Sequence, residues 1–387
     1  MIGKLFSLTV GAVAMAWSVA AGSLAAISIA APDSPDVPIV YLQDLSSGQV
    51  LFAKEADRRF MPASITKVMT LYVAFEMIAA GELSTGQRFT LSDAAFEEWH
   101  RKGSTMFIPD GESVAVDNLL RGIAAVSAND GAVLLAEGAA GSVPAWVAKM
   151  NEAARRLGMR DTHFGTPNGW MDEGRTFTTA ADLARLARAL VTRHPKLYAQ
   201  YVGLPGYRFN GIAQDNRDPI TGRVEGADGI KTGFTNQSGS GFLGSAVRDG
   251  RRLVMVVAGA ERTRERNRLA RDLIEWGFLA YRARPLFDAG APIAAAMVQD
   301  GERTEVSLRA DGPVNATVPQ GHRGAVKLTV HYEGPLRAPI AEGEKVAELE
   351  IAAGDLPRSR VPLYATHDVA RADGWQRLRN GLLGIIR

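Results

Sequence analysis

Three short motifs carry the side chains in this 387-residue sequence that could perform acyl transfer. They are an S-x-x-K motif at Ser64–Lys67, an S-x-N motif at Ser127–Asn129 and a K-T-G motif at Lys231–Gly233. An isolated serine hydroxyl is a poor nucleophile and needs a base beside it. On a helix, residues three apart lie on one face. The first motif therefore predicts a nucleophile, Ser64, with its base, Lys67, one turn away.

The second motif and the second lysine are expected to complete the proton transfers. A lysine is a useful base near neutral pH only if its pKa falls, which burial beside another cation achieves. We expect Lys231 to be that cation. We expect Ser127 to relay a proton between the two lysines and the leaving nitrogen. Asn129 offers both a donor and an acceptor to the amide backbone of a substrate.

The K-T-G motif predicts a strand edge along which a substrate lies as an added strand. Gly233 has no side chain, and this leaves room for that substrate. Lys231 and Thr232 would then face the terminal carboxylate of the substrate. The backbone N–H groups of Ser64 and Phe234 are the expected oxyanion hole.

Sequence periodicity predicts an α+β domain over about residues 36–283 that would position these motifs. The expected strands are residues 38–45, 50–54, 242–246 and 252–258, and the expected helices are 64–80, 119–140, 143–157, 179–193 and 267–281. Thr178 or Thr179 can cap the fourth of these helices. Asp249-Gly250 is a hairpin signal between the last two strands.

A second, smaller domain is expected after Arg284-Pro285. Short alternating segments (TEVSLRA, AVKLTVHY and KVAELEI) are separated there by turns rich in glycine and proline. This pattern is typical of a small all-β domain, over about residues 284–366.

Both ends of the chain carry signals for a membrane or for export. Residues 1–31 have one early lysine, then a long uncharged apolar run and a small-x-small site before Pro32, which predicts a signal peptide; a membrane anchor is the alternative. Residues 374–387 predict an amphipathic helix with three arginines and no acidic residue. Such a helix suits an anionic membrane surface, and docking on its own protein is the alternative.

Composition narrows the classes of function. With 46% apolar and 22% charged residues, the chain can build a packed core. A net charge of only +2 does not suggest a nucleic-acid-binding protein. The absence of cysteine excludes disulfides, thiolate metal sites and cysteine nucleophiles. The six histidines lack the spacing of a zinc site, so neither a metal nor another cofactor is expected.

Together, the three motifs resemble the signature of low-molecular-mass penicillin-binding proteins, which are D-alanyl-D-alanine carboxypeptidases. The likeness covers about residues 36–370 and includes PASITKVMTLYVAFE, RKGSTMFIPDGESV, AVSANDGAVLLAE, DTHFGTPNGW, DGIKTGFT and LIEWGF. It implies a β-lactamase-like catalytic domain, made of an antiparallel sheet with a helical subdomain and followed by a small all-β domain. It also implies a periplasmic protein, peripheral on the outer face of the inner membrane.

The resemblance implies a reaction and roles for the site residues. Peptidoglycan stem pentapeptides would lose their terminal D-alanine through an acyl-enzyme on a serine, and β-lactams would inhibit by acylating that serine. The implied residues are Ser64 as nucleophile, Lys67 as base, and Ser127, Asn129, Lys231 and Thr232 to complete the site. An arginine before the last helix of the catalytic domain would bind the carboxylate. Arg266 fits that place best, with Arg262 and Arg264 close by.

Two positions depart from the family pattern, and several rival functions remain open. Some members carry histidine where this chain has Phe234, and several carry it where this chain has Asn168. A class A β-lactamase would need a glutamate for deacylation, which the segment RDTHFGTPNGW lacks. A DD-endopeptidase or a transpeptidase is harder to reject, because the same site can act on another amine. A non-catalytic wall-associated scaffold is disfavoured by the complete set of motifs, and the glycine spacing around Lys231 does not fit a P-loop.

Overall fold

The computed structural model describes residues 29–376 and divides into two compact units. Most of the predicted signal peptide and most of the predicted C-terminal helix lie outside the described residues. The first unit comprises Ala30–Leu45 and Leu51–Phe278, and it contains all three motifs. Among the described residues, the second comprises the Ser46–Val50 segment and residues 279–376.

A five-stranded antiparallel sheet forms the centre of the first unit, in the order β2-β1-β9-β8-β7. Its strands are β1 (Ile39–Asp44), β2 (Val50–Lys54), β7 (Ala227–Thr235), β8 (Gly239–Arg248) and β9 (Arg251–Ala260). In β9 the run from Leu253 to Ala258 is fully buried on both faces. A strand this apolar must be covered on both sides.

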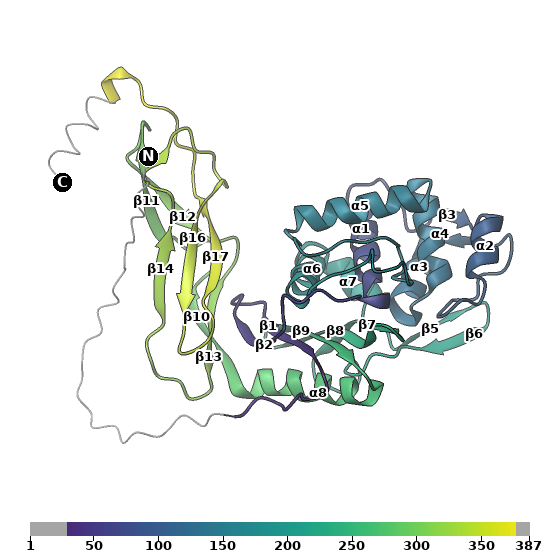
Figure 1. Ribbon diagram of the computed structural model, residues 1–387. Helices are drawn as coiled ribbons and strands as arrows, with labels where there is room; N and C mark the ends of the chain where they lie inside the picture. The colour runs from purple at the N-terminus through teal and green to yellow at the C-terminus, as the bar shows by residue number, and fades with distance from the viewer. Residues whose placement is uncertain (1–28, 377–387) are drawn as a thin grey trace. The chain divides into compact units, whose positions relative to one another are not determined.

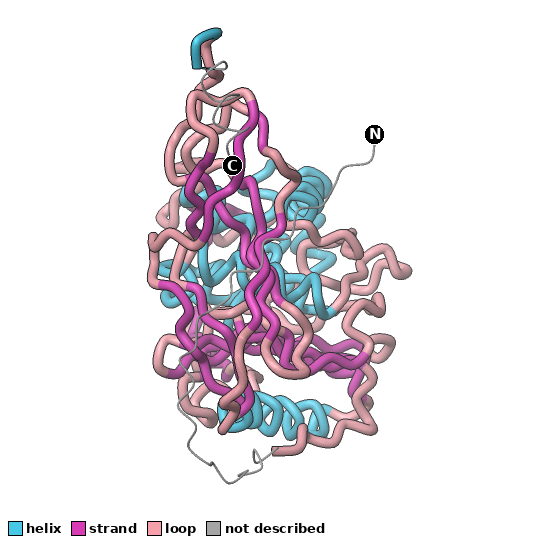
Figure 2. The backbone as a smooth tube through the Cα atoms, turned by 90° about the vertical axis from the view of Figure 1, so that its left-hand side faces the viewer, coloured by secondary structure: helices cyan, strands magenta, loops and turns pink. Residues whose placement is uncertain are grey.

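Helices provide that cover. Figure 1 shows α8 (Thr263–Ala280) on one face of the sheet and the remaining helices on the other, and Figure 2 shows the same arrangement from the side. The remaining helices are α1 (Lys67–Ala79), α2 (Asp93–Trp99), α3 (Val116–Arg121), α4 (Asn129–Ala140), α5 (Val143–Arg156), α6 (Ala180–Arg193) and α7 (Pro195–Tyr201). Two small two-stranded sheets complete the unit: β3 (Arg88–Thr90) pairs with β4 (Ser113–Ala115), and β5 (Gly206–Phe209) forms a hairpin with β6 (Ile212–Asp215).

The predicted hairpins and most of the predicted helices agree with the structure, and three boundaries differ. The first helix begins as a 3-10 turn, η1 (Ala63–Thr66), so Ser64 precedes the α-helix. The stretch 119–140 is not continuous: α3 passes into a π-helical turn, η2 (Gly122–Val126), and stops at Ser127. Ser127 has φ 65°, a left-handed conformation that ends a helix. The last helix starts at Thr263 rather than Asn267 and so includes Arg266.

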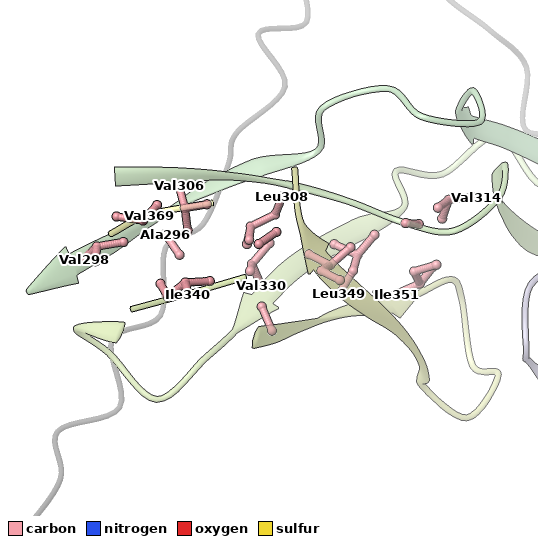
Figure 3. Close-up of a cluster of buried hydrophobic side chains, with 14 of the residues drawn as sticks. Ala296, Val298, Val306, Leu308, Val314, Val330, Ile340, Leu349, Ile351 and Val369 are labelled. Carbon is pink, nitrogen blue, oxygen red and sulfur yellow. The ribbon is translucent and has the colours of Figure 1, made fainter. Parts of the chain in front are cut away.

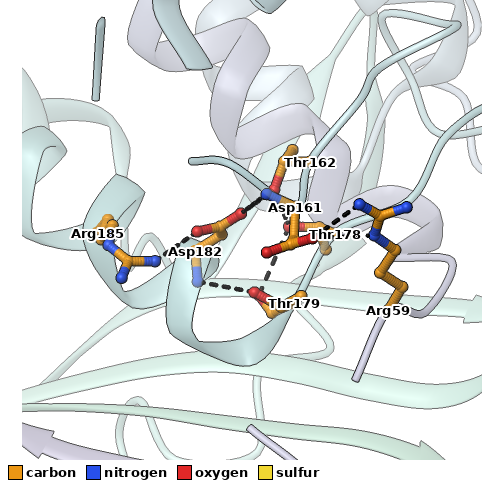
Figure 4. Close-up of polar contacts among 7 residues, drawn as sticks. All are labelled: Arg59, Asp161, Thr162, Thr178, Thr179, Asp182 and Arg185. Carbon is orange, nitrogen blue, oxygen red and sulfur yellow. Dashed lines mark hydrogen bonds and ion pairs between the residues drawn. The ribbon is translucent and has the colours of Figure 1, made fainter. Parts of the chain in front are cut away.

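The start of α6 follows the predicted cap. Thr179 accepts a hydrogen bond from the backbone N–H of Asp182 at 3.1 Å. The buried Asp182 carboxylate then accepts from the Asp161 N–H and the Thr162 hydroxyl. Figure 4 shows how these contacts tie the segment before α6 to the helix start, with Arg59 pairing to Asp161 at the rim. The network positions the chain that follows Gly158, which leads into the site described below.

The second unit is all β, as expected. Its main sheet has the order β14-β16-β17-β12-β11-β15, beside a separate pair, β10-β13. The strands are β10 (Tyr281–Phe287), β11 (Ala294–Gln299), β12 (Glu305–Arg309), β13 (Val314–Pro319), β14 (Lys327–His331), β15 (Leu336–Arg337), β16 (Lys345–Ala352) and β17 (Ser359–Ala365). Alternate residues of these strands build one apolar core, seen in Figure 3. The predicted boundary after residue 283 falls inside β10.

Among the described helices, none alone is long and apolar enough to span a bilayer; α4 and α5 pass that test only as a pair bent by 89°.

A buried ion pair holds two central strands together and gives a test of the fold. Arg251 on β9 pairs with Asp44 on β1 at 2.5 Å, with side chains 8% and 0% exposed. Asp44→Ala leaves a buried guanidinium without its carboxylate, so we expect a loss of about 3–5 kcal/mol in the free energy of unfolding. Asp161→Ala removes an exposed pair and should cost less than about 1 kcal/mol. Urea unfolding followed by tryptophan fluorescence compares the two, and equal losses would contradict this reading of the sheet.

Candidate active site

The serine and lysine of the first motif lie in contact. Ser64 lies on η1 and Lys67 is the first residue of α1. Lys67 Nζ lies 2.9 Å from Ser64 Oγ, and it donates to Asn129 Oδ1 and to the Asn168 backbone carbonyl, each at 2.7 Å. The amine is fully buried. The predicted pairing of Ser64 and Lys67 on one face is therefore present in the structure, with two further oxygens around the amine.

Burial and a neighbouring cation lower the pKa of this amine. Desolvation acts most strongly on Lys67, followed by the positive charge of Lys231, so its pKa lies well below 10.5. Asp130 acts in the opposite direction. Lys231 is itself buried, and desolvation followed by the charge of Arg217 lowers its pKa to about 7. Lys231 therefore lies close enough to Lys67 for its positive charge, when present, to lower the pKa of that amine.

Asp130 is a participant that the sequence analysis did not single out. Its carboxylate accepts hydrogen bonds from the backbone N–H groups of Met106, Ile108 and Gly131. Burial nevertheless raises its pKa. A negative charge here limits how far the pKa of Lys67 falls. The available signal was its position directly after Asn129, at the start of a helix where a carboxylate is favoured.

The Asn129 side chain makes hydrogen bonds within the protein and also has groups left to offer a ligand. Its Oδ1 accepts from Lys67, and its Nδ2 donates to the Lys102 carbonyl at 3.0 Å. An amide side chain has two N–H donors and two lone pairs, so one of each remains for a substrate. Asn168, noted above as a departure, contributes its backbone carbonyl to Lys67, while its side-chain oxygen accepts from the Trp170 N–H. The backbone role of Asn168 left no signature in the sequence.

Two glycines let neighbouring segments approach the turn that carries Ser64. A Cβ on Gly233 would lie 2.5 Å from the Pro62 carbonyl oxygen, and one on Gly169 would lie 1.9 Å from that of Ala63. The absent side chain of Gly233 therefore faces η1, which differs from the expectation that it makes room for substrate. Glycine is required here because β7 packs directly against η1.

The strand that carries K-T-G is the last strand of the sheet. β7 is paired with β8 on one side only, and its other edge is not paired within the sheet. Thr232, Gly233 and Phe234 line a cleft of about 860 Å³ that also contains Ser64, Ser127 and Asn129. Phe234 is 58% exposed. The edge is therefore accessible to an extended peptide, as predicted.

Of the three arginines that the sequence offered for the carboxylate, Arg266 is the one that lines the cleft. It is 4% exposed, lines the cleft and donates to the Gly241 carbonyl at 3.2 Å. Burial lowers its pKa to about 10, opposed by Asp218, so the guanidinium stays charged at neutral pH. Arg262 is instead an exposed partner of Glu265, and Arg264 does not line the cleft. Lys231 lies behind the lining, with its Nζ 3.2 Å from the Thr232 carbonyl oxygen.

The described part of the chain offers neither a cluster of metal ligands nor a free carboxylate base beside the serine. Residues 29–376 contain no group of three or more His, Asp or Glu side chains placed to hold a metal ion. Of the described residues that line the cleft, Asp218 alone is acidic. Its carboxylate already accepts from the Ile220 and Thr221 N–H groups and from the Thr221 hydroxyl. A serine hydroxyl in contact with a buried lysine amine is the arrangement that a serine hydrolase with a lysine base would need.

Comparison with known proteins places the chain in a family. The D-alanyl-D-alanine carboxypeptidase family model matches residues 29–262, and the model of the penicillin-binding protein 5 C-terminal domain matches residues 281–371. The chain belongs to the D-alanyl-D-alanine carboxypeptidase family, whose members are serine peptidases.

Individual relatives align with this chain along most of their own length. The D-alanyl-D-alanine carboxypeptidase DacD of Salmonella typhimurium is 32% identical over 90% of both chains. DacA of Escherichia coli is 32% identical over 86% of this chain and 84% of its own. The crystal structure of penicillin-binding protein 5 from Haemophilus influenzae superposes with a TM-score of 0.76 at 30% identity, over 88% of this chain and 100% of that one. The predicted family and fold class are confirmed.

The electrostatic coupling of the two lysines can be measured directly. With lysines labelled at Cε, NMR titration should give Lys67 a pKa well below 10.5. Lys231→Met removes a neighbouring positive charge, which makes protonation of Lys67 easier, so the pKa of Lys67 should rise. Lys196→Met, at an exposed position on α7, is the matched control and should leave it unchanged. An unaltered Lys67 pKa in Lys231→Met would show that the coupling is absent.

Proposed function

We propose that this protein removes the terminal D-alanine from peptidoglycan stem pentapeptides through an acyl-enzyme on Ser64. Membership of the carboxypeptidase family supports the reaction type. The observation that carries the assignment to Ser64 is the 2.9 Å contact between its hydroxyl and the buried amine of Lys67.

The first step is attack by Ser64 on the carbonyl of the penultimate D-alanine. A neutral lysine amine has two N–H donors and one lone pair. The two donors match the Asn129 and Asn168 oxygens, so the lone pair is directed to the Ser64 hydroxyl and accepts its proton. The backbone N–H groups of Ser64 and Phe234 stabilise the oxyanion that forms.

The free edge of β7 and the nearby cations determine how the substrate peptide lies in the cleft. The peptide lies along β7, beside Thr232 and Gly233, and its terminal carboxylate is held by Arg266 with Thr232 and Lys231. Ser127 relays the proton to the leaving nitrogen, so that the C–N bond breaks and D-alanine departs as the amine. Water then hydrolyses the ester and restores Ser64.

β-Lactams fit the same site as inhibitors. Their strained amide acylates Ser64, while the rest of the molecule stays attached and hinders water. The D2 penicillin-binding protein of Listeria monocytogenes supports this proposal: its ampicillin-bound structure has a TM-score of 0.58 at 27% identity, over 64% of this chain and 100% of that one. Because the carboxylate of Asp218 is already hydrogen-bonded, the cleft offers no carboxylate base of the kind that makes a class A β-lactamase fast.

Mass spectrometry after exposure to benzylpenicillin tests the nucleophile. We expect a stable adduct on Ser64 and release of D-alanine from a stem pentapeptide, both lost in Ser64→Ala. Lys67→Met should lower the rate of acylation by about 10²–10⁴-fold, because the general base is gone. Lys149→Met makes the same chemical change at an exposed site on α5 and should acylate normally. No adduct with intact penicillin, together with no D-alanine release, would refute the proposal.

Export and attachment to a membrane surface are part of the same proposal, and they rest on the sequence. The uncharged run within residues 1–31 supports export to the periplasm, and the arginines of residues 374–387 support peripheral attachment to the inner membrane. The full mature chain should sediment with anionic vesicles in low salt. A chain that ends at residue 373 should stay in the supernatant. Equal sedimentation of the two would contradict attachment through this segment.

A further inference from the structure

A lysine that takes no part in the proposed chemistry is held between two tryptophan rings. Lys102 Nζ lies 4.6 Å from the centre of the Trp99 ring and 5.4 Å from that of the Trp170 ring. The rings meet edge to face, with 5.8 Å between their centroids and 87° between their planes. The face of an aromatic ring attracts a cation. The ammonium group therefore joins Trp99, at the end of α2, to Trp170, in the loop before α6.

The backbone of the same segment contacts Asn129. The Asn129 side-chain Nδ2 donates to the Lys102 carbonyl at 3.0 Å, and the Asn129 backbone N–H donates to the Ser104 carbonyl at 2.8 Å. Gly103, between these two carbonyls, has φ 70°, and a Cβ there would lie 2.8 Å from Asn129 Nδ2 and 2.7 Å from Trp170 Cζ3. The segment therefore lies directly against both the asparagine and the second ring.

The Lys102 carbonyl determines which end of the Asn129 amide faces the base. A carbonyl oxygen can only accept a hydrogen bond, so the N–H end of the amide turns toward Lys102. The other end, Oδ1, then faces Lys67 and accepts from its amine at 2.7 Å. If the amide were rotated, Nδ2 would face Lys67, and the lone pair of the amine would accept from that N–H. This lone pair is the one that takes the proton of Ser64 in the proposed mechanism.

The second ring belongs to the segment that provides the other oxygen around the base. The Asn168 backbone carbonyl accepts from Lys67 at 2.7 Å, and the Asn168 side-chain oxygen accepts from the Trp170 N–H at 3.0 Å. Trp170 is thus bound to Asn168 through its backbone and to Lys102 through its ring. The two segments that orient the amine of the base are therefore linked through one ammonium group.

We propose that Lys102 is a positioning residue for the acylation of Ser64. Held by the two tryptophans, its carbonyl keeps the Asn129 amide turned so that the lone pair of the base stays free. The inference rests on the proposed function, because it concerns the same acylation step. Glu98 also pairs with Lys102, at 3.2 Å, but both side chains are solvent-accessible and such a pair contributes little. The contacts with the rings are what hold the lysine.

Stopped-flow measurement of acylation by benzylpenicillin tests this role. Lys102→Met keeps most of the side chain and removes its charge, so we expect the acylation rate constant to fall about tenfold, with the dissociation constant of the non-covalent complex unchanged. The apparent pKa of the base in the pH profile of that rate should also fall, because Oδ1 no longer accepts from the protonated amine. Lys231 and Asp130, the charged groups that act on the pKa of Lys67, are unaltered in this variant.

Two further variants separate the ring contacts from the ion pair. Lys102→Arg should restore both the rate and the pH profile, since a guanidinium also stacks on tryptophan. Glu98→Gln removes the ion pair and keeps the ring contacts, so this matched control should acylate like the parent protein.

The remaining outcomes each overturn a stated claim. Normal acylation by Lys102→Met would refute the positioning role. A slower rate with an unmoved pH profile, or no recovery in Lys102→Arg, would show that the residue serves only the stability of the fold. An equal loss in Glu98→Gln would assign the effect to the ion pair. If urea unfolding shows that Lys102→Met does not fold, Lys102→Gln makes the same comparison. A parent protein that forms no benzylpenicillin adduct refutes the proposed function itself.

Discussion

The contact between the buried amine of Lys67 and the hydroxyl of Ser64 is the constraint on which the rest of the catalytic unit depends. Removing a charged ammonium group from water costs free energy, so burial favours the neutral form of the amine and lowers its pKa. A neutral amine still has polar atoms to satisfy. Its N–H groups donate to the Asn129 side chain at the start of α4 and to the Asn168 carbonyl in the loop before α6. Three distant parts of the chain therefore have to meet at one nitrogen.

Close backbone approach makes this convergence possible. η1 is crowded by the loop at Gly169 and by β7 at Gly233, and neither position has room for a Cβ. Gly241 on β8 also faces η1, where a Cβ would lie 3.2 Å from Ile65 Cδ1. The turn that presents the nucleophile is thus held by packing on its neighbours as well as by its own backbone hydrogen bonds. Rigid placement of this kind is what a nucleophile needs, because small displacements are costly in rate.

Local patterns in the sequence predicted the elements and the motif residues but not the contacts made by backbone atoms. The hairpin of β8 and β9, the cap at Thr179 and the pairing of Ser64 with Lys67 follow from periodicity, turn chemistry and helix spacing. The break at Ser127 lies within an apolar, alanine-rich stretch, where tertiary packing overrides helix propensity. The hydrogen bond to the Asn168 carbonyl and the packing of Gly233 against η1 depend on backbone atoms, so no pattern of side chains in the sequence predicts them. Asp130 stands next to the S-x-N motif in the sequence, but only the structure shows that its charge raises the pKa of Lys67.

The cations of the site differ in how readily they lose charge, and the order suits the proposed chemistry. Burial and the charge of Lys231 hold the pKa of Lys67 well below its usual value, Lys231 has a pKa of about 7, and Arg266 remains charged with a pKa of about 10. A lysine buried like Arg266 would lose its proton far more easily, so a guanidinium is the group that can hold a carboxylate in so dry a place. A carboxylate arriving near Lys231 favours its protonated form and raises its pKa. The added charge on Lys231 in turn disfavours protonation of Lys67. Binding of an anionic substrate would therefore secure the neutral state of the base at the moment when the base is needed.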